Sequence, residues 1–520
     1  VHVAPVGLVA QLVVVEHDGQ APVDELLRHL GGRALFHLVE VAKFGALHLL
    51  VIHRLERLGF IIDGERGVAR AGPGRREVVQ QREQLIAGAC DLVVHSWKDL
   101  PVEEHPETLI AATLPRADQR DVLLVRADRW EQVRMSGKLT VLTSAPRRSH
   151  NLQDVLPAAL PASLTQLNFV PVRGNIQTRV QKLLTGEAEG LIIAKAALDR
   201  LLEADTEEFV AARAELRAAL AHCYWMVLPL RLNPTAAAQG ALALEARRVD
   251  APLRAVLQTI NCDETYAAVE RERNLLRRYG GGCHQAIGVS VLRRSYGEIT
   301  FVRGLDAAGQ NLSEATLQPA RPRPPQVPRA ALWPLQREQH DWFTRVALPS
   351  VPPAGQPPLW IARANALPAD WTIPPTQRVW ASGWETWRKL AARGVWVNGC
   401  AEGLGEHEPT LITTLHGEPL EWLKLTHAAS TTDSGMQTLA TYRLEPRPDG
   451  VNVTALTQAA YYFWSSGSSF QHALAYLPDL CNRRHFCGPG ATQQALEAAG
   501  ITPHICLDYE QWLAEFGRTP

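Results

Sequence analysis

The sequence lacks any apolar run of the roughly 20 residues that a membrane-spanning helix requires. It also lacks an excess of one charge, since 53 Lys and Arg residues stand against 54 Asp and Glu residues. We therefore expect a protein without a membrane partner and not a general nucleic-acid binder, while a local basic cleft for a small polyanion stays open.

Cysteine pairs of the CxxC type are absent as well. The eight cysteines are spread widely, which in a chain of 520 residues indicates reduced thiols rather than a disulfide scaffold. The 18 histidines show no ligand spacing such as HExxH, so we expect no metal. Residues 1–15 are apolar but have no basic leader or clear cleavage site, so we expect a cytoplasmic protein, and we expect a monomer.

The length predicts three to five domains, because one compact domain rarely exceeds about 250 residues. Helical patterns alternate with short apolar runs over residues 75–250, and this alternation predicts an α/β fold. We predict helices over 76–87, 176–184 and 262–278, and strands over 92–94, 191–194, 287–289 and 299–302.

Residues 319–358 carry eleven of the 35 prolines. Proline has no amide donor and disfavours helix in the preceding residue, so we predict a linker there. A second α/β region is predicted over 359–520, with a weak internal repeat that follows a glycine-containing turn each time. The repeated positions are Thr386, Leu390 and Gly394 in the first copy and Thr492, Leu496 and Gly500 in the second.

An amine and a carboxylate stand at the end of a predicted buried strand. Residues 91–101 read DLVVHSWKDLP, so the strand delivers Lys98 and Asp99 to its carboxyl end and Pro101 stops it. Ligands of α/β proteins bind at such ends, where this pair can act in acid–base chemistry or stabilise a cation. A surface salt bridge after a strand is the alternative interpretation.

Two arginine-bearing segments each follow an apolar stretch and open a helix. Their sequences are TSAPRR at 143–148 and RGNIQTR at 173–179. Helix N-termini and arginine both favour carboxylates, so we predict a polycarboxylate cleft, with a solvated helix face as the alternative. The candidate residues are Thr143, Ser144, Arg147, Arg148, Arg173 and Arg179.

The segment GGGCH at 280–284 places a cysteine in an open glycine loop. Glycines let another group approach the backbone closely, so Cys283 is a candidate for covalent attachment, and a buried cysteine in a tight turn is the alternative. We interpret the other seven cysteines as packing residues. We expect His95 and His284 to form local hydrogen bonds rather than to bind a metal.

Taken together, these segments resemble the porphobilinogen deaminase (hydroxymethylbilane synthase) family. Its motifs VHSxKDxP, TSSxRR, RGNxxTR and Gly-Gly-Cys occur in order across about 75–315, with Ala145 in place of the second serine of TSSxRR. A Gln-Gly-Ala-Leu segment that begins at Gln239, and the pair Glu270 and Arg271, also match.

The resemblance implies an α/β fold with two periplasmic-binding-protein-like domains and a small α+β cofactor domain, followed by a second α/β region. The active cleft would lie between domains 1 and 2. The implied bounds are 75–118 with 232–250 for domain 1, 119–231 for domain 2 and 251–318 for domain 3, with 1–74 unassigned, the linker at 319–358 and the second region at 359–520.

The resemblance also implies a reaction of tetrapyrrole (heme and porphyrin) biosynthesis, in which four porphobilinogen molecules are joined with release of ammonia. A dipyrromethane cofactor would be bound by a thioether to Cys283. Asp99 would assist the loss of ammonia with Lys98 nearby. The implied cofactor-binding residues are Lys98, Thr143, Ser144, Arg147, Arg148 and Arg173, and the implied substrate-binding residues are Arg147, Arg148, Arg173, Arg179 and Gln239.

The sequence departs from this family at its start. The family's GTRxSxLAxxQ segment is not found in residues 1–74, and GPGRR at 72–76 stands where a Lys-Gly-x-Phe loop is expected. A wrong start or frame, real divergence and a degenerate, non-catalytic remnant all account for this. A binding protein for a carboxylated ligand is a further alternative, although simple binding needs neither Asp99 nor Cys283.

Residues 359–520 resemble part of uroporphyrinogen-III synthase, a family that acts on hydroxymethylbilane. The resemblance rests on SGWET at 382–386, TYR at 441–443, FWSSGS at 463–468 and CGPGAT at 487–492. It implies that Ser466, Ser468 and Thr492 bind substrate carboxylates, and helix N-caps are the alternative role. The region is short for that family's two domains, so we expect one domain and part of the other, and a second activity stays open.

Overall fold

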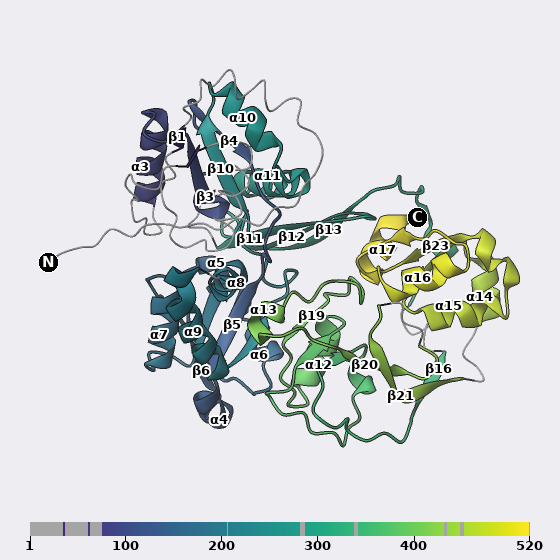
Figure 1. Cartoon of the computed structure of the whole chain (residues 1–520). Coiled ribbons are helices and arrows are strands. Elements are labelled where there is room, and N and C mark those ends of the chain that lie inside the picture. The colour runs from purple at the N-terminus through teal and green to yellow at the C-terminus, as the bar shows by residue number, and fades with distance from the viewer. Residues whose placement is uncertain are drawn as a thin grey trace.

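The computed structural model describes residues 75–204, 206–280, 286–336, 342–430, 434–447 and 452–518, with two short strands, β1 (Leu35–Phe36) and β2 (Ile61–Ile62), before them. The remainder of segment 1–74 and the glycine loop with Cys283 and His284 lie outside the described residues. The described chain is a mixed α/β protein with several sheets, which confirms the predicted class (Figure 1). None of its described helices has the length and apolarity needed to cross a membrane.

The first sheet joins segments that lie far apart in the sequence. Its strand order is β3-β10-β4, with β10 antiparallel to both neighbours, so chain near residue 95 pairs with chain near residue 243. Apolar side chains of β3 and β10 pack against α10 and form one core. The elements are α3 (Arg75–Ile86), β3 (Leu92–Ser96), β4 (Thr108–Ala112), β10 (Leu242–Arg247) and α10 (Ala251–Gln258).

A buried carboxylate ties this sheet to its helix. Glu245 of β10 accepts hydrogen bonds from Arg82 Nε (2.7 Å) and Thr108 Oγ1 (2.5 Å), and it pairs with His95 Nε2 (2.8 Å). Burial raises the pKa of Glu245, but the hydrogen bond to His95 and the other partners lower it to about 2. His95 therefore forms a hydrogen bond in the core, in line with the role that we expected.

The second sheet is mixed and has the order β7-β6-β8-β5-β9, in which β6 is parallel to β7 and β8 while β5 is antiparallel to β8 and β9. The strands are β5 (Asp121–Arg126), β6 (Lys138–Leu142), β7 (Gln166–Val170), β8 (Gly190–Ala194) and β9 (Cys223–Val227). The helices are α4 (Ala127–Ser136), α5 (Pro146–Leu152), α6 (Val155–Ala159), α7 (Ile176–Leu184), α8 (Lys195–Glu203) and α9 (Glu207–Ala221).

The third sheet is an antiparallel meander, β11-β12-β13, against which α11 packs. Its elements are α11 (Asp263–Arg278), β11 (Ile287–Arg294), β12 (Gly297–Leu305) and β13 (Asn311–Pro319). The predicted helix and strand pair are present, and β13 is an addition to them. Glu272 of α11 is fully buried and accepts hydrogen bonds from Arg116, from the Ala238 amide (2.7 Å) and from the Val291 amide (2.8 Å), so it ties the chain that follows β4 and precedes β10 to β11 of the third sheet.

The C-terminal region contains a six-stranded sheet, β16-β21-β20-β17-β18-β19, and a parallel four-stranded sheet, β15-β22-β23-β24. The first comprises β16 (Phe343–Ala347), β17 (Leu359–Ile361), β18 (Val379–Ala381), β19 (Gly399–Cys400), β20 (Leu423–His427) and β21 (Gln437–Pro446). The second comprises β15 (Leu332–Trp333), β22 (Tyr461–Trp464), β23 (Arg484–Cys487) and β24 (His504–Ile505).

The helices of this region are α12 (Trp384–Ala391), α13 (Thr413–His416), α14 (Val453–Gln458), α15 (Gly467–Leu474), α16 (Ala491–Ala498) and α17 (Tyr509–Phe516). The weak repeat has a structural counterpart in α12 and α16. Each follows a parallel strand and buries its leucine fully, Leu390 in one and Leu496 in the other. Each ends near a glycine with positive φ, Gly394 or Gly500.

The proline-rich segment differs from the linker that we expected. Besides β15 and β16 it contains β14 (Val327–Pro328), and all three strands pair with C-terminal partners: β14 with β25 (Gly517–Arg518), β15 with β22 and β16 with β21. A proline can occupy a strand edge where its missing amide is not needed, so a high proline content did not exclude these short edge strands.

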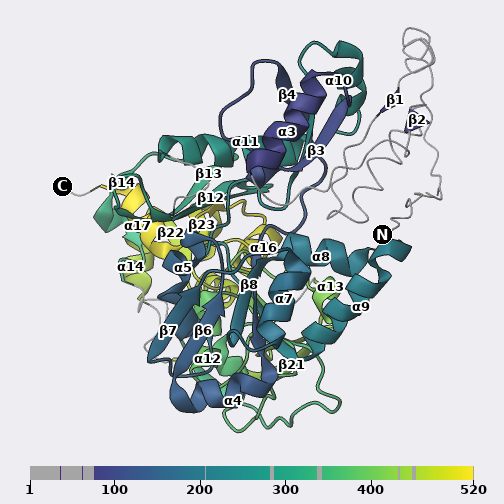
Figure 2. The same cartoon turned by 90° about the vertical axis from the view of Figure 1, so that its left-hand side faces the viewer.

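The second sheet and the six-stranded sheet share their hydrophobic core. Trp130 and Trp396 meet edge to face with their ring centroids 5.0 Å apart, and the Val227 amide donates to the Asn398 carbonyl (2.8 Å). Figure 1 shows these two sheets next to each other, with the first sheet above them and β11–β13 running between the first sheet and the other two. Figure 2 shows the first sheet above α7 and α8 from the side.

Candidate functional site

Lys98 and Asp99 lie where β3 ends. The strand passes into a single 3₁₀ turn, Trp97–Asp99, which is anchored by the buried Trp97 ring and by the Trp97 amide that donates to the Ala241 carbonyl (3.1 Å). Asp99 is exposed and Lys98 is half-buried. Burial lowers the pKa of Lys98; Asp99 opposes that effect, whereas Arg148 adds to it, so Lys98 faces the second sheet.

The two arginines of the first motif meet a buried carboxylate. Asp121, the first residue of β5, accepts hydrogen bonds from Arg148 Nη2 (2.6 Å) and Nε (3.0 Å), and its Oδ2 lies 3.0 Å from Arg147 Nη2. Arg147 and Arg148 are only 4% and 5% exposed. Burial by itself raises the pKa of Asp121, but the two guanidinium groups hold it well below its ordinary value.

Residues of the return segment complete this cluster. The side-chain amides of Gln239 (2.8 Å) and Asn233 (3.0 Å) donate to Asp121, and Arg147 donates to the Pro234 carbonyl (2.9 Å). Arg147, Arg148 and Gln239, which we assigned to substrate or cofactor, are thus engaged with one another through Asp121. The sequence analysis missed Asp121; its signal was an acidic residue at the head of the apolar run 122–125.

The second motif opens α7, as predicted. Asn175 caps the helix by accepting from the Thr178 amide (2.8 Å), and Arg179 Nε donates to the Gly174 carbonyl (2.8 Å). Arg173 is exposed. Burial lowers the pKa of Arg179, Arg148 lowers it further and Asp99 raises it, so Arg179 faces both the first motif and the end of β3.

Thr143 and Ser144 hold the two motifs side by side. The Thr143 amide donates to the Val170 carbonyl (2.9 Å), and the Ser144 hydroxyl donates to the Val172 carbonyl. Both contacts continue the parallel pairing of β6 with β7, which brings the chain after each strand to the same edge of the sheet. These two residues therefore position the arginine segments.

The structure brings the predicted residues Lys98, Asp99, Arg147, Arg148, Arg179 and Gln239 together, and the predicted residues Thr143 and Ser144 position the arginine segments beside them. Lys98 and the arginines outnumber Asp99 and Asp121, so the region between the first and second sheets has a net positive charge. Asp99 is the exposed carboxylate of this group. Such an arrangement suits a ligand with several carboxylates and gives it one acid or base.

The remaining cysteines follow our interpretation in part. Cys90, Cys223, Cys400, Cys487 and Cys506 are buried. Cys262 is half-buried and Cys481 is exposed, so Cys481 corrects the assignment of all seven to packing. Its exposure reflects its place in a surface 3₁₀ turn, Pro478–Asn482, whose core contact is Leu480 instead.

A cavity of about 220 Å³ lies between the two C-terminal sheets. Ser466 and Ser468 line it, whereas Thr492 lies outside it in the first turn of α16. Ser466 is also the N-cap of α15 and accepts from the Ser469 amide (3.1 Å), so the alternative role holds for this residue. The sequence analysis missed Arg345, Arg363, His427 and Ser469 among the other polar lining residues, and it quoted Tyr442 and Ser465 as parts of motifs without a binding role.

Residues 78–255 match a protein family described as "Porphobilinogen deaminase, dipyromethane cofactor binding domain". A porphobilinogen deaminase domain is thereby supported. The match covers the first two sheets with Lys98, Asp99 and both arginine motifs, and it agrees with the dipyrromethane cofactor that we predicted.

Two porphobilinogen deaminases illustrate the likeness. The chain is 35% identical to that of Nocardia farcinica over 237 residues, which are 46% of this chain and 59% of the relative. It is 35% identical to that of Mycobacterium tuberculosis H37Rv over 239 residues, which are 46% of this chain and 66% of the relative. The chain thus spans less than two thirds of each relative.

Among solved structures, a mutant uroporphyrinogen III synthase of the bacterium Thermus thermophilus aligns with 34% of this chain and 84% of its own at 13% identity and a TM-score of 0.24. A putative periplasmic sulfonate-binding protein of Methylobacillus flagellatus KT aligns with 46% of this chain and 68% of its own at 11% identity and a TM-score of 0.24. Neither score establishes a shared fold.

Proposed function

We propose that the chain acts as a hydroxymethylbilane synthase, which joins four porphobilinogen molecules head to tail and releases ammonia. One observation carries this proposal. Lys98 and Asp99, in the turn after β3, lie near Arg148 and Arg179 of the second sheet's helices, so that acid–base and carboxylate-binding groups face each other. The domain bounds implied by the resemblance, with the cleft between domains 1 and 2, are part of the proposal.

The cations fit a carboxylated cofactor and substrate. Each porphobilinogen carries an acetate and a propionate, so the growing chain gains two carboxylates with every unit. Lys98, Arg173 and Arg179 would hold these groups at the surface of the cleft, with Arg148 behind them. When bound to Cys283, the dipyrromethane supplies the pyrrole carbon to which the first unit is joined.

Asp99 would carry the proton chemistry. Its exposed carboxylate lies after the end of β3, in the 3₁₀ turn Trp97–Asp99 that the buried Trp97 ring anchors. The positively charged Arg179 faces this carboxylate across the cleft. A carboxylate at this place stabilises the cationic carbon that remains when ammonia leaves the substrate. It then accepts the proton displaced when the new carbon–carbon bond forms.

The intact mass of the purified full-length chain tests the covalent part. We expect wild type to carry an excess equal to two linked pyrrole units, and Cys283→Ser to lack it. Cys481→Ser is the matched control, because it removes an exposed thiol elsewhere and is expected to keep the excess. Folded but unmodified wild-type protein would favour the binding protein or the degenerate remnant instead.

Ammonia release from porphobilinogen tests the catalytic part. We expect Asp99→Asn to lower kcat by at least about 100-fold, which is the usual loss for a general acid–base group, while the mass excess of purified protein is retained. Unchanged turnover in Asp99→Asn would remove Asp99 from the mechanism.

A second candidate function is a uroporphyrinogen-III synthase-like activity of the C-terminal region. The favouring observation is the cavity that combines Ser466 and Ser468 with Arg345 and Arg363, since hydroxyls and arginines together bind carboxylates. Consumption of hydroxymethylbilane, with separation of the cyclic product isomers, tests it. We expect Arg363→Gln to slow the catalysed closure and Thr492→Ala to leave it unchanged, and equal rates in both variants would overturn this candidate.

A further inference from the structure

Two stretches of chain connect the first sheet with the second. Residues 113–120 lead from β4 to β5, and residues 228–241 return from β9 to β10. Both stretches contact one loop of the C-terminal region, residues 401–412, which lies between β19 and α13. A segment that follows the deaminase-like part by more than about 80 positions in the sequence thus reaches the connection between its first two sheets.

Glu402 of this loop holds the return stretch. Its Oε1 accepts from the Leu230 amide and its Oε2 from the Arg231 amide, both at 2.8 Å. Burial raises the pKa of Glu402, although the two amides partly offset this. The residue has a left-handed backbone, with φ at +54°, which a non-glycine residue adopts only where its surroundings compensate the strain.

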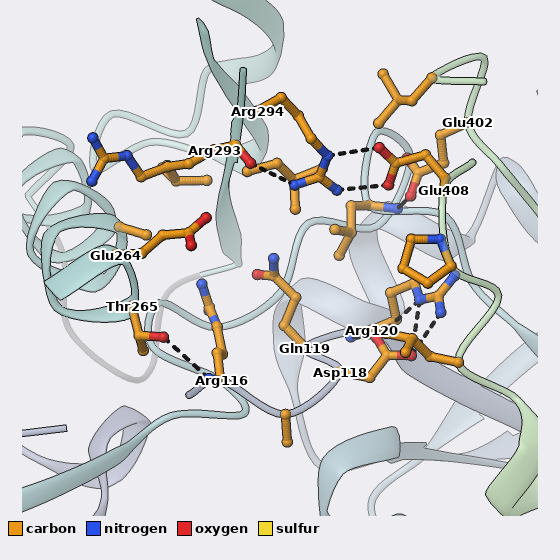
Figure 3. A pocket seen from close by; sticks show the side chains of 18 of the residues that line it. Arg116, Asp118, Gln119, Arg120, Glu264, Thr265, Arg293, Arg294, Glu402 and Glu408 are labelled. Carbon is orange, nitrogen blue, oxygen red and sulfur yellow. Dashed lines mark hydrogen bonds and ion pairs between the residues drawn. The ribbon is translucent and has the colours of Figure 1, made fainter. Parts of the chain in front are cut away.

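The same loop holds the outgoing stretch and the third sheet. Arg120 donates to the Thr410 carbonyl (2.7 Å), and Arg294 of β11 forms two hydrogen bonds of 2.6 Å with Glu408. Figure 3 shows Glu402, Glu408, Arg294 and Arg120 around one cavity, of about 380 Å³. The loop is therefore tied to both connecting stretches and to β11.

The return stretch carries this restraint to the arginine cluster. The Asn233 amide donates to the Pro229 carbonyl (2.9 Å), so residues 229–233 form one turn whose middle is held by Glu402. Asn233 then donates to Asp121 (3.0 Å), and the next carbonyl, that of Pro234, accepts from Arg147 (2.9 Å). A displacement of this turn would move two partners of the Asp121–Arg147 pair.

We propose that Glu402 is a positioning residue that clamps the return stretch and thereby fixes the arginine cluster of the candidate site. The kinetic consequence rests on the proposed function; the clamp itself does not. Glu402 touches no reacting group, so it acts through Leu230, Arg231 and the turn that follows them. The C-terminal region thus stabilises the geometry of the deaminase-like part in the same chain.

Hydrogen exchange of the full chain tests the clamp without any substrate. Glu402→Gln keeps the size of the side chain but replaces one acceptor oxygen by an NH₂ group that faces an amide donor. We expect exchange at Leu230 and Arg231 to become about tenfold faster, which corresponds to the loss of one hydrogen bond. Glu385→Gln, an exposed change on α12, is the control and should leave both amides unchanged. Equal exchange in Glu402→Gln and wild type would overturn the clamp.

Ammonia release from porphobilinogen tests the positioning role. We expect Glu402→Gln to raise KM severalfold with a smaller change in kcat, because Arg147 and Arg148, which lie behind the carboxylate-binding cations, are displaced while Asp99 is not. Faster exchange with an unchanged KM would overturn the link to the arginine cluster. If wild type releases no ammonia, the proposed function fails, and the exchange measurement decides the clamp on its own.

Discussion

At the scale of single residues, two arginines that the sequence suggested for ligand binding instead form ion pairs with a buried aspartate. Arg147 and Arg148 lie within 3.0 Å of the Asp121 carboxylate at the boundary of the first two sheets. A buried ion of this kind needs its partner, since an uncompensated charge in a protein interior is strongly destabilising. Arg147 and Arg148 therefore stabilise the folded site through Asp121, in addition to any contact with a ligand.

Glu245 allows a prediction for stability at low pH. Its pKa is about 2 in the folded chain and near 4.5 when unfolded, so the unfolded chain takes up the proton first as the pH falls. The stabilisation is complete above about pH 4.5 and is lost toward about pH 2, with a size on the order of 3 kcal/mol. In urea unfolding followed against pH, we expect Glu245→Gln to be less stable at pH 7 and to lose this slope.

The matched control for this experiment is Glu83→Gln, which removes an exposed carboxylate from α3, the helix that carries Arg82. It should keep both the stability at pH 7 and the slope between about pH 4.5 and pH 2. If the free energy of unfolding of Glu245→Gln still falls between about pH 4.5 and pH 2, groups other than Glu245 cause the acid sensitivity.

At the scale of elements, local patterns were accurate where the deciding interactions are local. The helix predicted over 176–184 has those bounds, because Asn175 and Thr178 form its cap within one turn. The buried strands β3 and β8 were likewise visible as apolar runs. The edge strands β14–β16 were not, because pairing partners more than about 90 positions away hold them in the sheets.

A comparison of Gly240 with Gly88 distinguishes the cost of a left-handed backbone from the cost of steric overlap when alanine replaces glycine. Both have positive φ, +89° and +73°, so alanine at either position costs about 1 kcal/mol for the left-handed backbone. A Cβ at Gly240 would also lie 2.6 Å from the Ala117 carbonyl oxygen of the outgoing stretch, whereas at Gly88 it meets nothing within 4 Å. In urea unfolding we expect a loss of about 1 kcal/mol for Gly88→Ala and of about 3 kcal/mol for Gly240→Ala. Equal losses would show that the two connecting stretches separate easily.

At the scale of the whole molecule, the C-terminal region is part of the same packed body as the second sheet. Trp387 donates to the Ala159 carbonyl and Trp396 to the Trp225 carbonyl, each at 2.9 Å, and both indole rings are buried. The interface therefore resembles the interior of one domain rather than a contact between two separate ones.

Trp396→Ala tests this shared core. Removal of a large buried aromatic side chain costs about 3–5 kcal/mol, and here the loss should appear on both sides of the interface. We expect faster hydrogen exchange in β9 as well as in β19. Trp512→Ala is the control, because it removes an equally buried ring of α17, which packs against the four-stranded sheet, and should leave β9 unchanged. If Trp396→Ala speeds hydrogen exchange in β19 but not in β9, the second sheet and the six-stranded sheet have separate cores.

The sequence by itself determined the α/β class, the helices near 76–87, 176–184 and 262–278, and the strands near 92–94, 191–194, 287–289 and 299–302. It also placed Lys98, Asp99 and the arginine motifs at a strand end and two helix starts. Those features follow from periodicity, capping and turn residues within a few positions of one another. Only the tertiary structure decided that Asp121 holds both arginines, that Glu272 ties the two connecting stretches to β11 and that Glu402 holds the return stretch. Their partners lie tens to hundreds of residues away, and burial, not sequence order, selects which opposite charges and amides must meet.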